Sequence, residues 1–183
     1  MFFDFSSAFN TIQPHLLVQK LLNMKLPSSV ISWIFDYLTN RFQYIRLNGV
    51  LSSVICTNTG APQGAVLAPF LFSLYTADCR NTDEWYPLVK FVDDTDQVRK
   101  ISNNEDALYH KQIENFVNWC DKNYLYLNIS ETKEMCIDFR KNQRCPTPVY
   151  IEREAVERVE TYKYLGVVFD SKLNWKENIN TVL

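Results

Sequence analysis

The sequence is poor in the residues on which several classes of protein depend. Among its 183 residues are five cysteines, an odd number with no CxxC pair, so neither a disulfide framework nor a zinc site is predicted. These cysteines are most simply reduced thiols of the core. Only two histidines are present, which leaves little material for a Ser/His/Asp or Cys/His catalytic centre. Any catalysis by this chain must therefore depend on carboxylates.

The chain also lacks a strong excess of positive charge and any long hydrophobic run. Its net charge of -2 is not that of a self-sufficient nucleic-acid binder, whose affinity comes largely from neutralising phosphates. No apolar stretch approaches the roughly 20 residues that span a bilayer. The opening residues MFFDF carry neither a basic leader nor a cleavage site. We expect an intracellular protein, cytoplasmic or nuclear, with no membrane partner.

Hydrophobic residues, in contrast, are abundant enough for a substantial core. They make up 46% of the chain, which is typical of one globular domain. Apolar spacing and turn residues predict a short strand ending at Asp4, helices beginning near Pro14 and Ser28, and a hairpin at Asn48–Gly49. A Gly/Pro loop then runs into a helix within TNTGAPQGAVLAPFLFSLY, and a hairpin bends in FVDDT. Asn103 or Asn104, which lie outside the residues that the structure describes, would cap a long helix whose buried stripe runs from Tyr109 to Tyr124. A strand at MCIDF and a hairpin pairing 149–151 with YKYLGVVFD follow. This order is an α+β pattern with a mostly antiparallel sheet.

Two adjacent acids in FVDDT (residues 91–95) follow a run of apolar residues. LVKFV predicts a strand that includes Val92, DDTD a turn, and QVRKI the returning strand. Taken alone, acids in a hairpin bend are typical of a solvated turn. If the strand that ends at Asp4 lay beside this hairpin, however, three carboxylates would meet at one end of a sheet, where repulsion is costly unless cations neutralise it. Magnesium suits such a site because it prefers hard oxygen ligands and substrate phosphates.

Five motifs extend this hypothesis to almost the whole chain. MFFDFSSAFNTI (residues 1–12), APQGAVLAP (61–69), FVDD (91–94), LNISETK (127–133) and YKYLG (162–166) occur in the order of the palm motifs of reverse transcriptases from LINE-type, non-LTR retrotransposons. The chain resembles that family. The resemblance implies an α+β polymerase palm, with a central antiparallel sheet and helices packed on one face. It implies a palm domain over residues 1–183, with the fingers missing at the N-terminus and the thumb missing at the C-terminus.

The resemblance assigns the catalytic role to the acids. Asp4 and Asp93 are similar to the two principal metal-binding carboxylates, and Asp94 to the acid beside them. All three are expected to be catalytic and to bind metal. Two Mg2+ ions, or Mn2+ in their place, would activate an attacking oxygen and stabilise a leaving one during phosphoryl transfer.

The same resemblance implies four nucleotide-binding residues: Phe9, Gln63, Gly64 and Lys133. Phe9 would lie beneath the incoming sugar, where its ring would clash with a 2′-hydroxyl and favour deoxynucleotides. Gln63 and Gly64 would lie against the template and the nascent base pair, and Lys133 near the leaving pyrophosphate. Without the motifs, Phe9 would be interpreted as a core aromatic and Gln63 as part of an ordinary loop. The family usually has lysine where Glu131 stands, which weakens the local positive charge.

Tyr164, Leu165 and Gly166 resemble the hairpin that holds the primer end, although this segment could equally be a packed strand. The implied activity is RNA-directed DNA polymerisation, with an RNA template, a DNA primer and dNTPs as partners. We expect the isolated chain to bind Mg2+ weakly and to polymerise poorly or not at all. Two other classes stay open: a non-catalytic remnant that binds nucleic acid or protein, and a small magnesium phosphohydrolase. The sequence does not indicate an oligomeric state.

Overall fold

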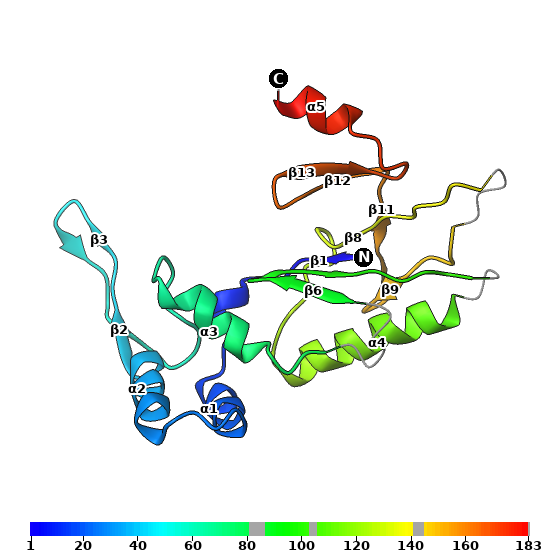
Figure 1. The fold of residues 1–183 in the computed structure, drawn as a ribbon. Coiled ribbons are helices and arrows are strands. Elements are labelled where there is room, and N and C mark those ends of the chain that lie inside the picture. Colours follow the sequence, from blue (N-terminus) through cyan, green and yellow to red (C-terminus); the bar gives the residue numbers. More distant parts are fainter. Residues whose placement is uncertain (81–86, 103–105, 141–144, 183) are drawn as a thin grey trace. The chain divides into compact units, whose positions relative to one another are not determined.

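A computed structural model of the chain describes residues 1–80, 87–102, 106–140 and 145–182. The chain forms two compact units. The first, called the sheet unit, consists of Met1–Phe5, Asn81–Asn118 and Leu127–Leu183. The second, called the helical unit, consists of Ser6–Arg80 and Trp119–Tyr126. Helices and strands occur together in an α+β fold, as the sequence predicts (Figure 1).

The sheet unit is built on a five-stranded sheet with the order β11-β8-β1-β7-β6. Its central strand, β1 (Phe2–Phe3), pairs antiparallel with β8 (Lys133–Glu134) on one side and with β7 (Asp94–Gln97) on the other. Strand β6 (Leu88–Phe91) pairs antiparallel with β7. Strand β11 (Glu157–Arg158) pairs in parallel with β8. The sheet is therefore mixed, which corrects the prediction of a central antiparallel sheet.

The two residues of β1 contact different elements on the two faces of the sheet. The ring of Phe3 lies 4.3 Å, between centroids, from that of Phe116 on α4 (Ala107–Lys122). The ring of Phe2 stacks at 4.2 Å on Tyr162 of β12 (Thr161–Tyr164). Because neighbouring side chains on a strand point to opposite faces, α4 covers one face and the hairpin of β12 and β13 (Val167–Asp170) covers the other (Figure 1).

One deeply buried carboxylate inside the sheet unit is paired. Glu134 is 2% exposed, and its carboxylate accepts hydrogen bonds of 2.7 Å from the Tyr109 hydroxyl and 2.7 Å from Arg158 Nε. A buried carboxylate is tolerated only with such partners. The unit is completed by a two-stranded pair, β9 (Tyr150–Ile151) with β10 (Glu154–Ala155), and by α5 (Lys176–Val182), which packs against β13.

The helical unit contains three amphipathic helices and a short 3-10 turn (Ala8–Asn10). The helices are α1 (Pro14–Asn23), α2 (Ser28–Leu38) and α3 (Leu67–Tyr75). Both predicted helix starts, at Pro14 and Ser28, are confirmed. Helix α1 packs against α2 and α3, and the buried side chains repeat at helical spacing: Leu17, Leu21, Ile31, Ile34, Leu38, Ala68, Leu71, Phe72 and Tyr75.

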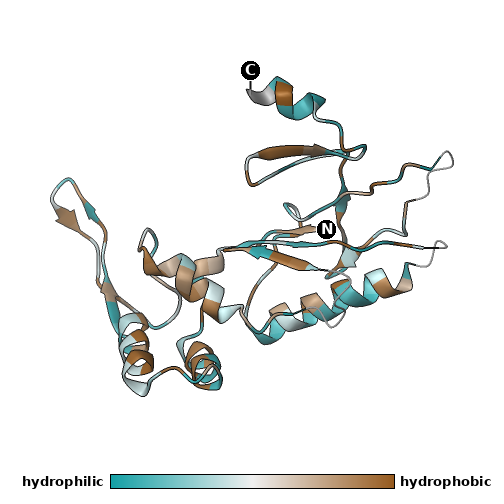
Figure 2. Cartoon of the chain, viewed as in Figure 1, coloured by the Kyte–Doolittle hydropathy of each residue, from teal (hydrophilic) through white to brown (hydrophobic). Residues whose placement is uncertain are grey.

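A β-ribbon follows α2 and also belongs to the helical unit. Its strands are β2 (Arg41–Gln43) paired with β5 (Ile55–Thr57), and β3 (Arg46–Leu47) paired with β4 (Val50–Leu51). The predicted tight turn at Asn48–Gly49 is confirmed, with φ of 49° and 82°. Hydrophobic and polar stretches both occur along this ribbon (Figure 2). Within the described ranges, no helix combines the length and the hydrophobicity needed to cross a bilayer.

One predicted strand and one predicted strand pairing are wrong. The MCIDF segment (residues 135–139) forms no strand; the strand in this region is β8, which ends at Glu134. Residues 150–151 pair with the nearby β10, and YKYLGVVFD folds back on itself as the β12–β13 hairpin. The sequence therefore indicates strand-forming regions here but not their partners.

Candidate functional site

The hairpin of β6 and β7 presents two adjacent acids at its bend. Its last register pair is Phe91 with Asp94, so only Val92 and Asp93 form the loop. The predicted turn DDTD therefore lies too far along the chain, because Asp94 already begins the returning strand. Val92 has a φ of 57°, a left-handed conformation that is strained for a β-branched residue, which corrects its placement in a strand. Asp93 lies at the tip and Asp94 at the end of a paired strand.

Asp4 follows β1 and lies next to this bend. Strand β1 pairs with β7 through Phe2 with Asp96 and Phe3 with Thr95, so one further step in the register places Asp4 opposite Asp94. Directly opposed residues of an antiparallel pair have Cβ atoms about 4.5–5.5 Å apart. The structure thus brings Asp4 together with the hairpin acids at one end of the sheet.

The pKa shifts of these acids agree with their proximity. Burial raises the pKa of Asp4, and the neighbouring carboxylates of Glu131, Asp93 and Asp94 raise it further, against a hydrogen bond from Asn128 that lowers it. Burial also raises the pKa of Asp94, with Asp93 contributing next. Carboxylates that raise each other's pKa repel one another when ionised, and a bound cation would remove that penalty. The donor chemistry of this cluster therefore fits a hard divalent cation.

The acids nevertheless form no closed metal cage. Across residues 1–80, 87–102, 106–140 and 145–182, no three His, Cys, Asp or Glu side chains are grouped so that they could hold a metal ion. Magnesium commonly binds proteins through one or two carboxylates, with water and substrate phosphates as its other ligands. An open cluster such as Asp4, Asp93 and Asp94 is compatible with that mode of binding, in which the substrate completes the site.

The β12–β13 hairpin lies against the same acids. Its two-residue turn, Leu165–Gly166, has φ of 47° and 85°, as a primed hairpin turn requires. Burial raises the pKa of Tyr162, followed by the charges of Asp94 and Asp4. The predicted primer-binding segment Tyr164–Gly166 therefore belongs to a hairpin whose tyrosines face the acid cluster.

Two neighbours of the cluster were missed by sequence reasoning. Asp96 is 8% exposed on β7 and, after burial, is the main cause of the raised pKa of Tyr164. Tyr162 stacks on Phe2 beside the acids. Their spacing in the sequence could have indicated both residues. Asp96 follows Asp94 by two positions and Tyr162 precedes Tyr164 by two, and residues two apart share a face of a strand.

Lys133 is engaged within the sheet unit. It begins β8, and its Nζ pairs with the Glu157 carboxylate at 2.7 Å and donates a hydrogen bond to the Ser130 carbonyl. Strand pairing supports this contact, because Lys133 and Glu157 are register partners between β8 and β11. The lysine therefore offers less net positive charge to a phosphate than an unpaired ammonium would.

Phe9, Gln63 and Gly64 belong to the helical unit. Phe9 is half-buried, and its ring meets the edge of Phe72 with centroids 5.6 Å apart. The loop that begins at Gly60 is hydrogen-bonded to the turn around Phe9: Ala61 N–H donates to the Phe9 carbonyl at 2.8 Å. Beyond this point Gln63 and Gly64 are exposed. The structure therefore gives Phe9 a partly packed position and leaves the Gln63–Gly64 loop accessible.

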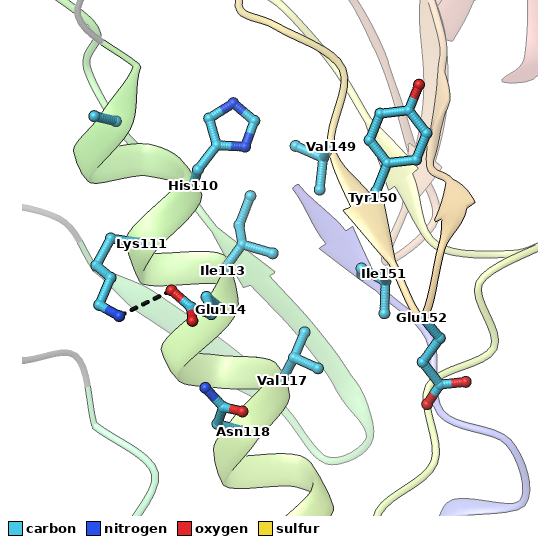
Figure 3. Close-up of a pocket in the computed structure, with 11 residues that line it drawn as sticks. His110, Lys111, Ile113, Glu114, Val117, Asn118, Val149, Tyr150, Ile151 and Glu152 are labelled. Atoms are coloured by element: carbon cyan, nitrogen blue, oxygen red, sulfur yellow. Dashed lines mark hydrogen bonds and ion pairs between the residues drawn. The ribbon is translucent and has the colours of Figure 1, made fainter.

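A cavity of about 390 Å3 lies elsewhere in the sheet unit, between α4 and β9 (Figure 3). It is lined by apolar residues such as Ile113 and Val117, and by the pair Lys111 Nζ to Glu114 Oε2 at 2.8 Å. None of the predicted site residues lines it. Because none of the predicted site residues lines this cavity, the acid cluster is the stronger candidate.

Comparison with known proteins agrees with the motifs. Residues 1–169 match the sequence profile of the family described as reverse transcriptase (RNA-dependent DNA polymerase). The chain is 29% identical, over its whole length, to a probable RNA-directed DNA polymerase from transposon X-element of Drosophila melanogaster. It is 27% identical, over 99% of its length, to the RNA-directed DNA polymerase from mobile element jockey of Drosophila funebris. In both cases the chain spans 20% of the relative.

Proposed function

The chain belongs to the reverse transcriptase family, and from that premise we propose that residues 1–183 are the palm of an RNA-directed DNA polymerase. The reaction joins a dNTP to the 3′-hydroxyl of a DNA primer on an RNA template. The observation that carries this proposal is the meeting of Asp4 with Asp93 and Asp94, which are far apart in the sequence. Reverse transcriptases in general use divalent metal ions, and this cluster is where the chain offers suitable ligands.

Asp4 and Asp93 would hold two Mg2+ ions, with Asp94 supporting them. When bound, such ions activate the primer hydroxyl and stabilise the leaving pyrophosphate oxygen. The protein's contribution is to keep carboxylates close together at the end of a rigid sheet. Their raised pKa values are the electrostatic cost of that arrangement, and this cost favours cation binding.

The remaining predicted residues would position the substrates. Phe9 would exclude a 2′-hydroxyl, and the exposed Gln63–Gly64 loop would contact the template and the base pair. Tyr164–Gly166 would hold the primer end near the acids, because the β12–β13 hairpin lies against them. Lys133 would stabilise the pyrophosphate, for which its ion pair with Glu157 would have to open.

Metal binding provides a direct test. Binding of Mn2+ to the 183-residue chain can be followed by electron paramagnetic resonance of the free ion. We expect Asp93→Asn to weaken binding by at least about tenfold, because it removes a charged ligand. Glu114→Gln is the matched control, since Glu114 is an exposed acid of α4 outside the cluster. Equal affinities for wild type and Asp93→Asn would refute the metal site.

Primer extension tests the chemistry. With an RNA template, a DNA primer, dNTPs and Mg2+, we expect slow synthesis by the wild-type chain and none by Asp93→Asn. Hydrolysis of phosphate esters without a primer would instead favour a phosphohydrolase. Template binding that persists in EDTA and survives Asp93→Asn, without synthesis, would favour a non-catalytic binding module.

A further inference from the structure

The β-ribbon of the helical unit, residues 41–57, exposes many large hydrophobic side chains. It extends beyond α2 (Figure 1) and contains no acidic residue. Its side chains that are 57–74% exposed are Phe42, Tyr44, Ile45, Leu47, Val50, Leu51, Val54 and Ile55. Exposed apolar clusters of this kind typically mark an interaction site. The ribbon is therefore a candidate contact surface that the polymerase proposal does not use.

Strand register sorts these side chains onto two faces of the ribbon. Leu47 is paired with Val50, so both lie on one face. Gln43 is paired with Ile55. Ile45 lies two positions from both Gln43 and Leu47, and residues two apart on a strand share a face. The side chains of Ile45, Leu47, Val50 and Ile55 therefore form one surface, called the aliphatic face, on which each is 62–72% exposed.

The ribbon's two arginines do not place a free charge on this surface. Arg46 is paired with Leu51 and lies on the opposite face, one residue out of step with Leu47. Arg41 lies at the base of the ribbon, where its Nη2 donates to the carbonyls of Thr59 at 2.5 Å and Gly60 at 2.8 Å. The aliphatic face thus consists of apolar and uncharged side chains beyond Arg41.

The edge of the ribbon is less suited to contact than this face. From Gln43 to Arg46 the first strand advances by three residues, whereas their partners Ile55 and Leu51 are four residues apart. The second strand therefore carries one extra residue within 52–54, which is a β-bulge. Bulges on exposed edges hinder the addition of another strand. Contact through the aliphatic face is accordingly favoured over edge-to-edge pairing.

We propose that the aliphatic face packs against the same face of a second copy of the chain, forming a symmetric homodimer. In such an interface each residue meets a patch identical to its own. Two uncharged apolar faces satisfy that condition, because no charge is buried when they meet. A nucleic acid would instead need cations to neutralise its phosphates, and on this side of the ribbon the only cation is the engaged Arg41. The inference does not depend on the acid cluster.

The available area sets the strength of this dimer. Complete burial of one Val, Leu or Ile side chain removes about 60–120 Å2 from water. Four such side chains at 62–72% exposure offer roughly 150–350 Å2 of apolar area per copy. Because homodimer interfaces are about 65% apolar, the two copies together would bury on the order of 500–1,100 Å2. That is the size of a weak, reversible complex, and we expect a Kd on the order of 100 µM.

Sedimentation equilibrium of the 183-residue chain, between about 10 and 500 µM, would measure this association. Ile45→Lys places a charge within the aliphatic face and should raise the Kd by at least about tenfold. Leu51→Lys is the matched control: Leu51 is 57% exposed on the same ribbon but lies on the opposite face, so its Kd should stay within about twofold of wild type.

Circular dichroism of each variant separates loss of folding from loss of association, and Val50→Lys replaces Ile45→Lys if the latter does not fold. The proposal is overturned if the wild-type chain stays monomeric over this range, if it grows beyond a dimer, or if lysine on either face weakens association equally. A monomeric wild type that co-sediments with phosphatidylcholine vesicles, and a folded Ile45→Lys variant that does not, would assign the face to a lipid surface instead.

Discussion

Gly60→Ala is expected to destabilise the chain much more than the same substitution at Gly49. Both glycines have left-handed backbones, with φ of 70° and 82°. A Cβ at Gly60 would lie 2.8 Å from Asn10 Cα and 2.9 Å from the Asn10 carbonyl oxygen, whereas a Cβ at Gly49 would have no atom within 4 Å. Gly60 is also fixed in place, since its N–H donates to the Ile12 carbonyl at 2.7 Å.

The expected loss in the free energy of unfolding at each glycine follows from these two environments. A left-handed backbone costs an L-residue about 1–2 kcal/mol, and the loss of glycine entropy from the unfolded chain offsets about 0.4–1 kcal/mol of this. Gly49→Ala should therefore cost about 0.5–1 kcal/mol. At Gly60 the backbone of residue 10 must also move, and overpacking of this kind typically costs about 1–3 kcal/mol more. Gly60→Ala should cost about 1.5–4 kcal/mol in total.

Urea unfolding followed by circular dichroism would measure both free energies. Gly49→Ala is the matched control, because it isolates the backbone term from the steric one. Equal losses for the two variants, within about 0.5 kcal/mol, would refute the close approach of Gly60 to Asn10.

Three further predictions concern the sheet unit. Val92→Gly should increase the free energy of unfolding by about 1 kcal/mol and so raise the melting temperature, because a left-handed backbone is strained at a β-branched residue. A lower melting temperature would contradict this. The pKa of Asp94 is raised by burial and then by nearby carboxylates, so the folded state keeps this proton to higher pH than the unfolded chain does. The stability of the fold therefore falls as the pH rises from the ordinary pKa of an aspartate to the raised pKa. Asp94→Asn should therefore be more stable than wild type at neutral pH in EDTA, and an unchanged pH profile of melting would refute the repulsion. Arg158→Ala should cost about 3–5 kcal/mol in urea unfolding, because it leaves the buried Glu134 carboxylate without its cation. Lys111→Ala, which breaks an exposed ion pair of α4, should cost under about 1 kcal/mol, and similar losses for the two would be inconsistent with burial as the cause.

Sequence patterns predicted the local elements better than their partners. Pro14 and Ser28 begin helices as expected, and Asn48–Gly49 forms a tight turn, because capping and turn chemistry act within a few residues. The alternation in MCIDF also indicates a strand, but β8, which pairs with β1 and with β11, ends before this segment, at Glu134. A strand forms only where a partner is present, so pairing stops at Glu134.

The bend of FVDDT also shows that local sequence patterns do not predict strand pairing. Turn propensity favours aspartate and disfavours valine in a loop, which places the predicted turn at DDTD. In the structure Asp94 pairs with Phe91 of β6, and the next residues of β7, Thr95 and Asp96, pair with both β6 and β1. Val92 is left in the turn with a strained backbone. Tertiary pairing here overrides local preference.

By itself the sequence determined the starts of α1 and α2, the Asn48–Gly49 turn and the family, because each depends on residue type and short-range spacing. It also supplied the acids, but not their geometry. Only the tertiary structure decided that Asp4 lies opposite Asp94, and that Asp96 and Tyr162 border the cluster. These relations depend on strand register between distant segments, which is set by the packing of both faces of the sheet and which no local pattern encodes.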